Sequence, residues 1–71
     1  MKKIEISTEY IKLDSFLKLC GVSGTGGEAK LLVKSGNVLV DGQVCTMRGK
    51  KLYPGTSVRI EQEAFEVAGK A

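Results

Sequence analysis

The chain has 71 residues, of which 42% are apolar and 27% charged, a balance typical of one ordered globular domain rather than a disordered tail. A domain this short buries only about 60% of the surface that its unfolded chain exposes, which excludes a deep substrate cavity beside the core. The formal net charge is only +3, but it is spread unevenly along the chain.

Positive charge is concentrated in the middle of the sequence. Residues 1–29 hold four lysines and four acids and sum to zero, whereas residues 60–71 hold three glutamates and one lysine and sum to −2. Residues 30–59 hold six basic residues against Asp41 alone, which gives +5. Clustered cations are typical of proteins that bind a phosphate-bearing partner. A lysine-rich surface that only aids solubility is the alternative.

In the first third of the chain, the sequence predicts a strand followed by a helix. Residues 3–7 alternate between polar and apolar, as in a half-buried strand. Four apolar residues then recur at the spacing of one helical face: Leu13, Phe16, Leu17 and Cys20. Gly21 is expected to end this helix in a left-handed conformation.

A second helix is predicted to begin at Thr25, which together with Glu28 forms a capping box. Its apolar face would carry Ala29, Leu32, Val33 and Gly36, with the helix ending at residues 35–36. Leu31 points away from that face, so it is either exposed or covered by another layer, for which the terminal strands are candidates.

From residue 37 the apolar period changes to two, which predicts strands. Asp41-Gly42 between residues 38–40 and 43–45 indicates a hairpin with a type I′ turn. Residues 46–51 are expected to form a basic loop, and Pro54-Gly55 a type II turn before a strand at 56–60. Residues 65–67 could pair with the N-terminal strand. The sequence therefore predicts an α+β fold of two helices packed on a small, mainly antiparallel sheet closed by the N- and C-terminal strands.

Catalysis is not expected of this chain. It contains no histidine, the commonest general base, and its carboxylates show no metal-binding spacing. Cys20 and Cys45 match neither a metal motif nor a disulfide framework, so we expect two reduced, core-packed thiols. We predict no catalytic residue, metal, cofactor or small-molecule substrate. No apolar run approaches a membrane span and no signal peptide is recognisable, so we expect a cytoplasmic protein that does not bind membranes.

The predicted binding surface is formed by cations that the helices and the basic loop would present to solvent. Lys30 and Lys34 are four residues apart on one helix, where like charges repel each other. The complete set is Lys18, Lys30, Lys34, Arg48, Lys50 and Lys51. Secondary phosphate contacts are expected from the glycine-rich turn, where free N–H groups open a helix, and from one further lysine. These residues are Lys12, Thr25, Gly26 and Gly27.

The aromatic content narrows the kind of nucleic acid. There are four aromatic residues, Tyr10, Phe16, Tyr53 and Phe65, and two or three of them look necessary for the core. Without an aromatic platform for unpaired bases, recognition would depend on backbone charge and shape. This favours structured or double-stranded RNA, although charge alone leaves DNA open.

Several segments in this order resemble the RNA-binding domain named after small-subunit ribosomal protein S-four, whose two helices and short sheet form the alpha-L motif. The segments are residues 11–17, the glycine-rich turn, residues 28–33, residues 35–42 and Pro54-Gly55. The match spans about residues 11–60 of a single domain at 1–71, and the chain is similar to small stand-alone bacterial members. In contrast to many members, the turn has Thr25-Gly26-Gly27 in place of an Arg or Ser, and Lys12 replaces an Arg that could contact phosphate through two donors.

The resemblance implies RNA binding through the outer face of the helix pair and the adjoining loop, on the six cations named above. Its partner would be a structured ribosomal or transfer RNA, with the ribosome as a candidate site of action. The alternative is a protein-binding adaptor that uses Leu31 or a sheet edge. Salt distinguishes the two, because phosphate contacts weaken steeply with salt and an apolar interface does not.

Overall fold

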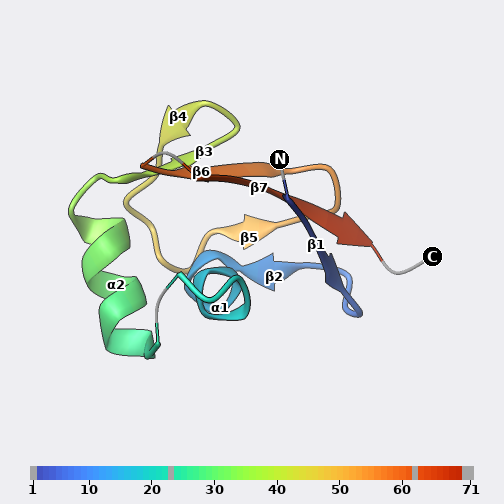
Figure 1. Ribbon diagram of the computed structural model, residues 1–71, viewed down its shortest axis with the longest axis horizontal. Coiled ribbons are helices and arrows are strands. Elements are labelled where there is room, and N and C mark those ends of the chain that lie inside the picture. Colours follow the sequence, from blue (N-terminus) through green and yellow to red (C-terminus); the bar gives the residue numbers. More distant parts are fainter. Residues whose placement is uncertain (1, 23, 62, 70–71) are drawn as a thin grey trace.

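The computed structural model describes residues 2–22, 24–61 and 63–69. In these residues the elements are β1 (Lys2–Ile6), β2 (Ile11–Lys12), α1 (Leu13–Leu19), α2 (Gly26–Lys34), β3 (Val38–Val40), β4 (Gln43–Val44), β5 (Lys51–Leu52), β6 (Ser57–Ile60) and β7 (Glu63–Gly69). Both helices lie on the same side of a long sheet (Figure 1). The predicted α+β class is confirmed.

The main sheet has the strand order β1-β7-β6-β3-β4. Its neighbours pair antiparallel except for β1 and β7, which run parallel with Lys2 opposite Phe65 and Ile6 opposite Gly69. The prediction that the two terminal strands pair is therefore confirmed. β1 lies at one edge of this sheet and β4 at the other.

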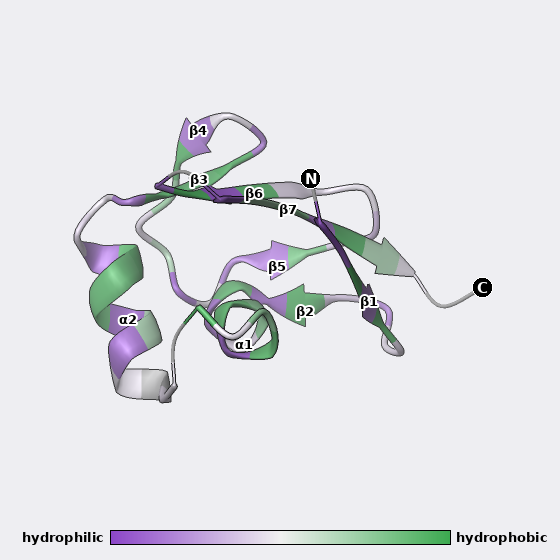
Figure 2. Ribbon diagram, viewed as in Figure 1, coloured by the Kyte–Doolittle hydropathy of each residue, from purple (hydrophilic) through white to green (hydrophobic). Residues whose placement is uncertain are grey.

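The core lies between the inner face of the main sheet and the two helices. β6 and β7 each turn alternate residues inward, among them Val58 and Val67, which are fully buried. Leu13 and Phe16 of α1 meet them from the helix side, and the Phe16 and Phe65 rings pack edge to face with centroids 6.4 Å apart. Figure 2 shows hydrophobic residues, in green, along α1, β6 and β7.

Three local predictions match the backbone conformation. Gly21 follows α1 with a φ of 79°, and Asp41 and Gly42 have φ values of 50° and 85°, the left-handed pair that a type I′ turn needs. The Thr25 Oγ1 atom accepts a hydrogen bond from the Glu28 N–H at 3.2 Å, so Thr25 caps α2. In contrast, Gly36 does not belong to the apolar face of α2. It lies beyond the C-cap residue Ser35 with a φ of 80°, because a helix commonly ends on a left-handed glycine.

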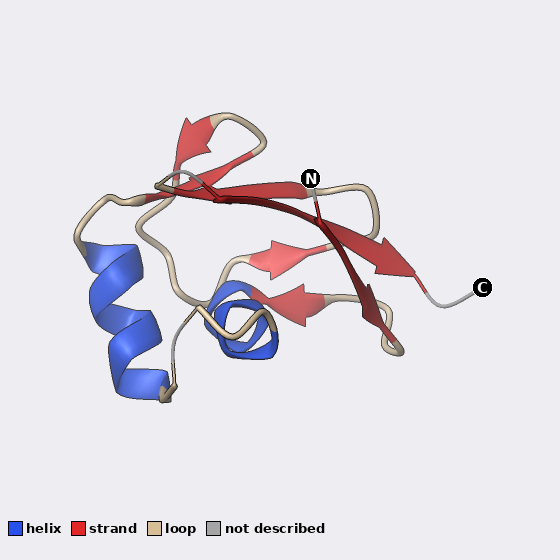
Figure 3. Ribbon diagram, viewed as in Figure 1, coloured by secondary structure: helices blue, strands red, loops and turns tan. Residues whose placement is uncertain are grey.

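A second, two-stranded ladder was not predicted. β2 pairs antiparallel with β5, with Ile11 opposite Leu52 and Lys12 opposite Lys51. Figure 3 shows this ladder beside α1, on the helix side of the main sheet. The segment expected to be a loop through residue 51 therefore enters a strand at Lys51. Two residues are too few to show an alternating pattern, which is why the sequence did not indicate these strands.

The structure also settles how Leu31 and the cysteines are packed. Leu31 is 70% exposed, so the terminal strands do not cover it. Cys20 and Cys45 are free thiols, partly buried against the core, as predicted. In the described part of the chain, neither helix has the length and apolarity needed to cross a bilayer.

Candidate nucleic-acid interface

The basic segment, residues 46–51, is fixed against the start of α1 by main-chain hydrogen bonds. The Leu13 N–H donates to the Lys50 carbonyl at 2.9 Å, and the Asp14 N–H donates to the Arg48 carbonyl at 3.0 Å. These bonds use N–H groups of the first turn of α1, which have no partner inside the helix. The three cations of the segment are thus held beside α1 rather than carried on a free loop.

The N-terminal end of the basic segment lies at the corner between α2 and β3. The Cys45 N–H donates to the Val38 carbonyl at 2.9 Å, and a Cβ placed on Gly36 would lie 3.8 Å from the Val44 side chain. Since Gly36 lies two residues after Lys34, the segment runs from the C-terminal end of α2 to the N-terminal end of α1. Figure 1 shows it crossing between the two helices.

The six predicted cations are placed on these neighbouring elements. Lys18 lies four residues beyond Asp14, or about 6 Å along α1 from the residue that bonds to Arg48. Lys34 is in the last turn of α2, and Lys30 precedes it by one turn. Lys30 is partly buried, and the other five are exposed: Lys18, Lys34, Arg48, Lys50 and Lys51.

Two charged residues, Arg59 and Asp14, make the positive surface differ from the charge pattern of the sequence. Arg59, which belongs to the cationic middle of the sequence, is exposed on β6 between the inward-facing Val58 and Ile60, so it lies on the outer face of the main sheet. Asp14 introduces an acid at the start of α1, where its Oδ1 atom accepts a hydrogen bond from the Ser15 N–H at 2.8 Å. The positive surface is therefore smaller and less uniform than the count along the chain indicates.

The glycine-rich turn carries a negative charge of its own. Glu28 Oε2 accepts a hydrogen bond from the Gly24 N–H at 3.2 Å, which places this carboxylate at the start of α2. A phosphate bound at Thr25, Gly26 and Gly27 would have to share this position with it.

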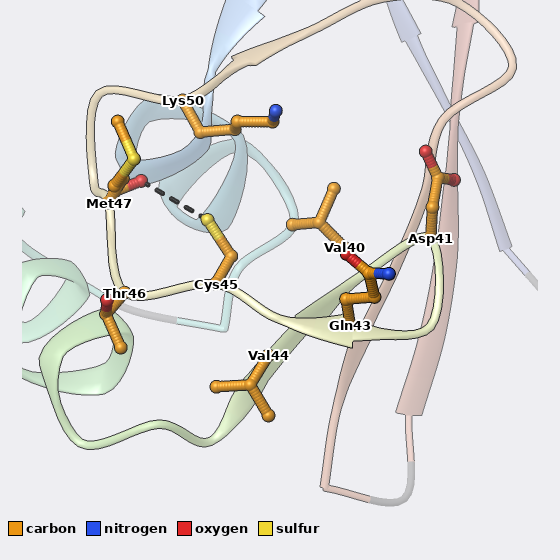
Figure 4. Close-up of a pocket in the computed structure, with 8 residues that line it drawn as sticks. All are labelled: Val40, Asp41, Gln43, Val44, Cys45, Thr46, Met47 and Lys50. Carbon is orange, nitrogen blue, oxygen red and sulfur yellow. Dashed lines mark hydrogen bonds between the residues drawn. The ribbon is translucent and has the colours of Figure 1, made fainter.

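An open hollow lies between the β3–β4 hairpin and the basic segment (Figure 4). Val40 and Val44 line it from the hairpin, and Met47 and Lys50 from the segment. The Cys45 thiol lies within it and contacts the Met47 carbonyl, with sulfur and oxygen 3.7 Å apart. Apolar side chains thus lie directly beside the cations of the segment.

The environment of the Cys20 thiol does not activate it as a nucleophile. Burial, together with the nearby Glu63 carboxylate, raises the pKa of Cys20 to about 11, and Lys2 opposes the shift. Cys20 is therefore a neutral thiol at physiological pH. In the part of the chain that the structure describes, no three metal-ligating side chains gather into a cluster.

Two tyrosines that the sequence did not place lie together at the surface. Phe16 and Phe65 are in the core, but the Tyr10 and Tyr53 rings pair with centroids 5.9 Å apart, at the end of the β2–β5 ladder. The Lys51 Nζ atom lies 4.8 Å from the Tyr10 ring centroid. The repeated tyrosine–lysine spacing, at 10 and 12 and at 51 and 53, is the signal that could have indicated this arrangement.

The sequence that forms this arrangement matches a known family. The sequence model of the S4-domain family matches residues 4–68 of the chain. This match extends beyond residues 11–60, which carried the resemblance. The chain belongs to the S4-domain family.

Curated relatives and a solved structure agree with this placement. The chain is 47% identical over 58 residues to the "Probable ribosome maturation protein RlbA" of Bacillus subtilis (strain 168), with 82% of each chain covered. It is 34% identical over 58 residues to the "Putative RNA-binding protein YbcJ" of Escherichia coli (strain K12), covering 82% of this chain and 83% of that one. The solution structure of YbcJ from E. coli is described as having an alpha-L motif involved in RNA binding. It superposes on this chain with a TM-score of 0.73 at 30% identity, and the superposition covers 96% of this chain and 87% of that chain. The predicted family and alpha-L fold are confirmed.

Proposed function

We propose that this S4-domain protein is a non-catalytic cytoplasmic RNA-binding protein. It recognises structured RNA, such as a ribosomal or transfer RNA, by the charge and shape of the backbone. Phosphates contact the basic segment together with the exposed sides of α1 and α2, through Lys18, Lys30, Lys34, Arg48, Lys50 and Lys51. Lys12 and the turn at residues 25–27 add secondary contacts.

The observation that carries the proposal is the pair of hydrogen bonds from Leu13 and Asp14 to the carbonyls of Lys50 and Arg48. They hold a segment with three cations in a defined position, so that little conformational entropy is lost when a phosphate backbone binds it. The names of the relatives, a ribosome maturation protein and an RNA-binding protein, support the same class of partner. The ribosome is accordingly the candidate site of action.

A charge-reversal variant tests the proposed surface. In the triple variant Lys30→Glu, Arg48→Glu and Lys51→Glu, each substitution changes the charge by −2, so the net charge falls from +3 to −3. We expect binding to a labelled RNA hairpin to be abolished while the circular dichroism spectrum is unchanged. For the wild-type protein, four to six phosphate contacts predict a log–log salt slope of about −3 to −4 with the single-strand coefficient of about −0.7 per contact.

A matched control separates the surface from the overall charge. The triple variant Lys2→Glu, Lys3→Glu and Arg59→Glu undergoes the same change in charge on the terminal strand and the outer sheet face. We expect it to retain most of the affinity for RNA. Equal loss in both triple variants would mean that the proposed surface has no special role, and unchanged binding in the first would refute it.

Leu31 supports the second candidate function, a protein-binding adaptor. Its side chain is 70% exposed on α2, where an apolar residue has no role in the core. An interface centred on Leu31 would show little dependence on salt and would be weakened by Leu31→Glu. RNA binding through the cations would instead weaken steeply with salt.

A further inference from the structure

The outer face of the β2–β5 ladder presents two tyrosines and two lysines together. Ile11 and Leu52 turn toward the core, and Leu52 is fully buried. Because side chains alternate along an extended strand, the residues on either side of them share the opposite face. These four residues, Tyr10, Lys12, Lys51 and Tyr53, form what we call the tyrosine–lysine face.

Within this face, Tyr53 has the ring that is open to a ligand. Its side chain is 47% exposed, whereas Tyr10 is partly buried and has Lys51 over its ring at 4.8 Å. The two rings are tilted by 48° with centroids 5.9 Å apart, so Tyr10 supports one side of Tyr53. An aromatic ring held in this way loses little freedom when a planar group stacks on it.

The charges of the face indicate which planar group it fits. Lys12 and Lys51 lie directly opposite each other in the ladder, and like charges in that relation destabilise a pair of strands. A peptide ligand would not in itself remove this repulsion, but a phosphate placed between the lysines would. An aromatic ring beside two cations is the combination with which proteins bind unpaired nucleotides.

We infer that the tyrosine–lysine face binds an unpaired nucleotide of the RNA, with its base stacked on Tyr53 and its phosphate between Lys12 and Lys51. Tyr10 is a positioning residue that holds the Tyr53 ring. Since Lys50 and Lys51 are consecutive, the face continues the basic segment. The inference rests on the proposed function, and it makes the preferred target a junction where a helix of RNA meets a single strand.

Three RNA probes test the inference. One is a blunt hairpin, and the other two are the same hairpin with a short adenosine tail, at the 3′ end in one and at the 5′ end in the other. The first base of each tail is 2-aminopurine. For the wild-type protein we expect one of the tailed hairpins to bind about tenfold more tightly than the blunt hairpin, the usual effect of stacking one base. Quenching of 2-aminopurine fluorescence on binding would report the stacking directly.

Two variants at one position separate stacking from other roles of the ring. Tyr53→Leu retains an apolar side chain but not an aromatic one, and we expect it to lose both the gain from the tail and the quenching. Tyr53→Phe retains the ring and should retain both. Far-ultraviolet circular dichroism checks that each variant is folded, and the blunt hairpin should bind all three proteins equally.

The outcomes distinguish this inference from the proposed function. If none of the three hairpins binds at low salt, recognition by backbone charge and shape is refuted, and the inference with it. If the blunt hairpin binds but neither tail improves binding, or if Tyr53→Leu retains the gain and the quenching, the inference alone is overturned. If Tyr53→Leu loses binding to the blunt hairpin as well, the ring contacts the helix and the assignment to an unpaired base is wrong.

Discussion

Leu52 connects the basic segment to the core, and its truncation to alanine is the sharpest test of the fold described above. The side chain is fully buried beneath the β2–β5 ladder, one residue after Lys51. Replacing a buried leucine by alanine costs about 2–5 kcal/mol, because apolar contacts are lost and a cavity remains. We expect about 3 kcal/mol at this position, near the middle of that range.

This loss is large relative to the whole stability of the domain. At about 0.05–0.15 kcal/mol per residue, a chain of this length is stable by only about 4–11 kcal/mol. The loss of about 3 kcal/mol expected for Leu52→Ala should lower the melting temperature by about 12–24 °C. Urea denaturation followed by circular dichroism measures the free energy of unfolding, and an unchanged m-value would show that unfolding stays two-state.

Leu31→Ala is the matched control, because it removes the same atoms from a side chain that is 70% exposed. We expect its free energy of unfolding to lie within about 0.5 kcal/mol of the wild-type value. If both variants lose the same stability, or if Leu52→Ala is as stable as the wild type, the placement of β5 over the core is wrong.

Two further predictions concern the hairpin turn and a partly buried thiol. Gly42→Ala should destabilise the protein by about 1 kcal/mol, because Gly42 has a φ of 85°. Gly49→Ala in the basic segment is the control: a Cβ at either glycine would meet open space, but Gly49 has no positive φ, so its substitution should change stability little. Equal effects of the two substitutions in urea denaturation would contradict this. Burial raises the pKa of Cys20 to about 11, so the folded protein holds the thiol proton more tightly than the unfolded chain does. The contribution of this proton to the free energy of unfolding is therefore fully present below the ordinary pKa of a thiol and is lost as pH rises toward about 11. Cys20→Ala should remove this loss of stability at alkaline pH. In the wild-type protein, the rate at which Cys20 is alkylated, measured by mass spectrometry, should rise over the same pH range. Alkylation that is already complete near neutral pH would refute the raised pKa.

Features that depend on neighbouring residues could be predicted from the sequence. The two helices follow from apolar residues at helical spacing, and the start of α2 follows from Thr25, whose hydroxyl can reach an N–H only three residues away. The hairpin follows from Asp41-Gly42, since few residue pairs tolerate two consecutive left-handed conformations. The six cations could be proposed because charge is visible in the sequence itself.

Features that depend on contacts between distant segments could not be predicted. Ile11 and Leu52 are 41 positions apart, and strands of two residues carry no periodic signal. The positions of Arg59 and of the two tyrosines follow from the direction in which each strand faces the core, which is decided by the packing of the whole domain.

The two helices, the hairpin, the family and the excess of positive charge were thus determined by the sequence alone, because local spacing and side-chain chemistry specify them. Only the tertiary structure decided which cations become neighbours and that an exposed tyrosine lies beside them. The physical reason is that both depend on main-chain hydrogen bonds between residues 11–14 and 48–52, which form only when the two segments pack on a common core.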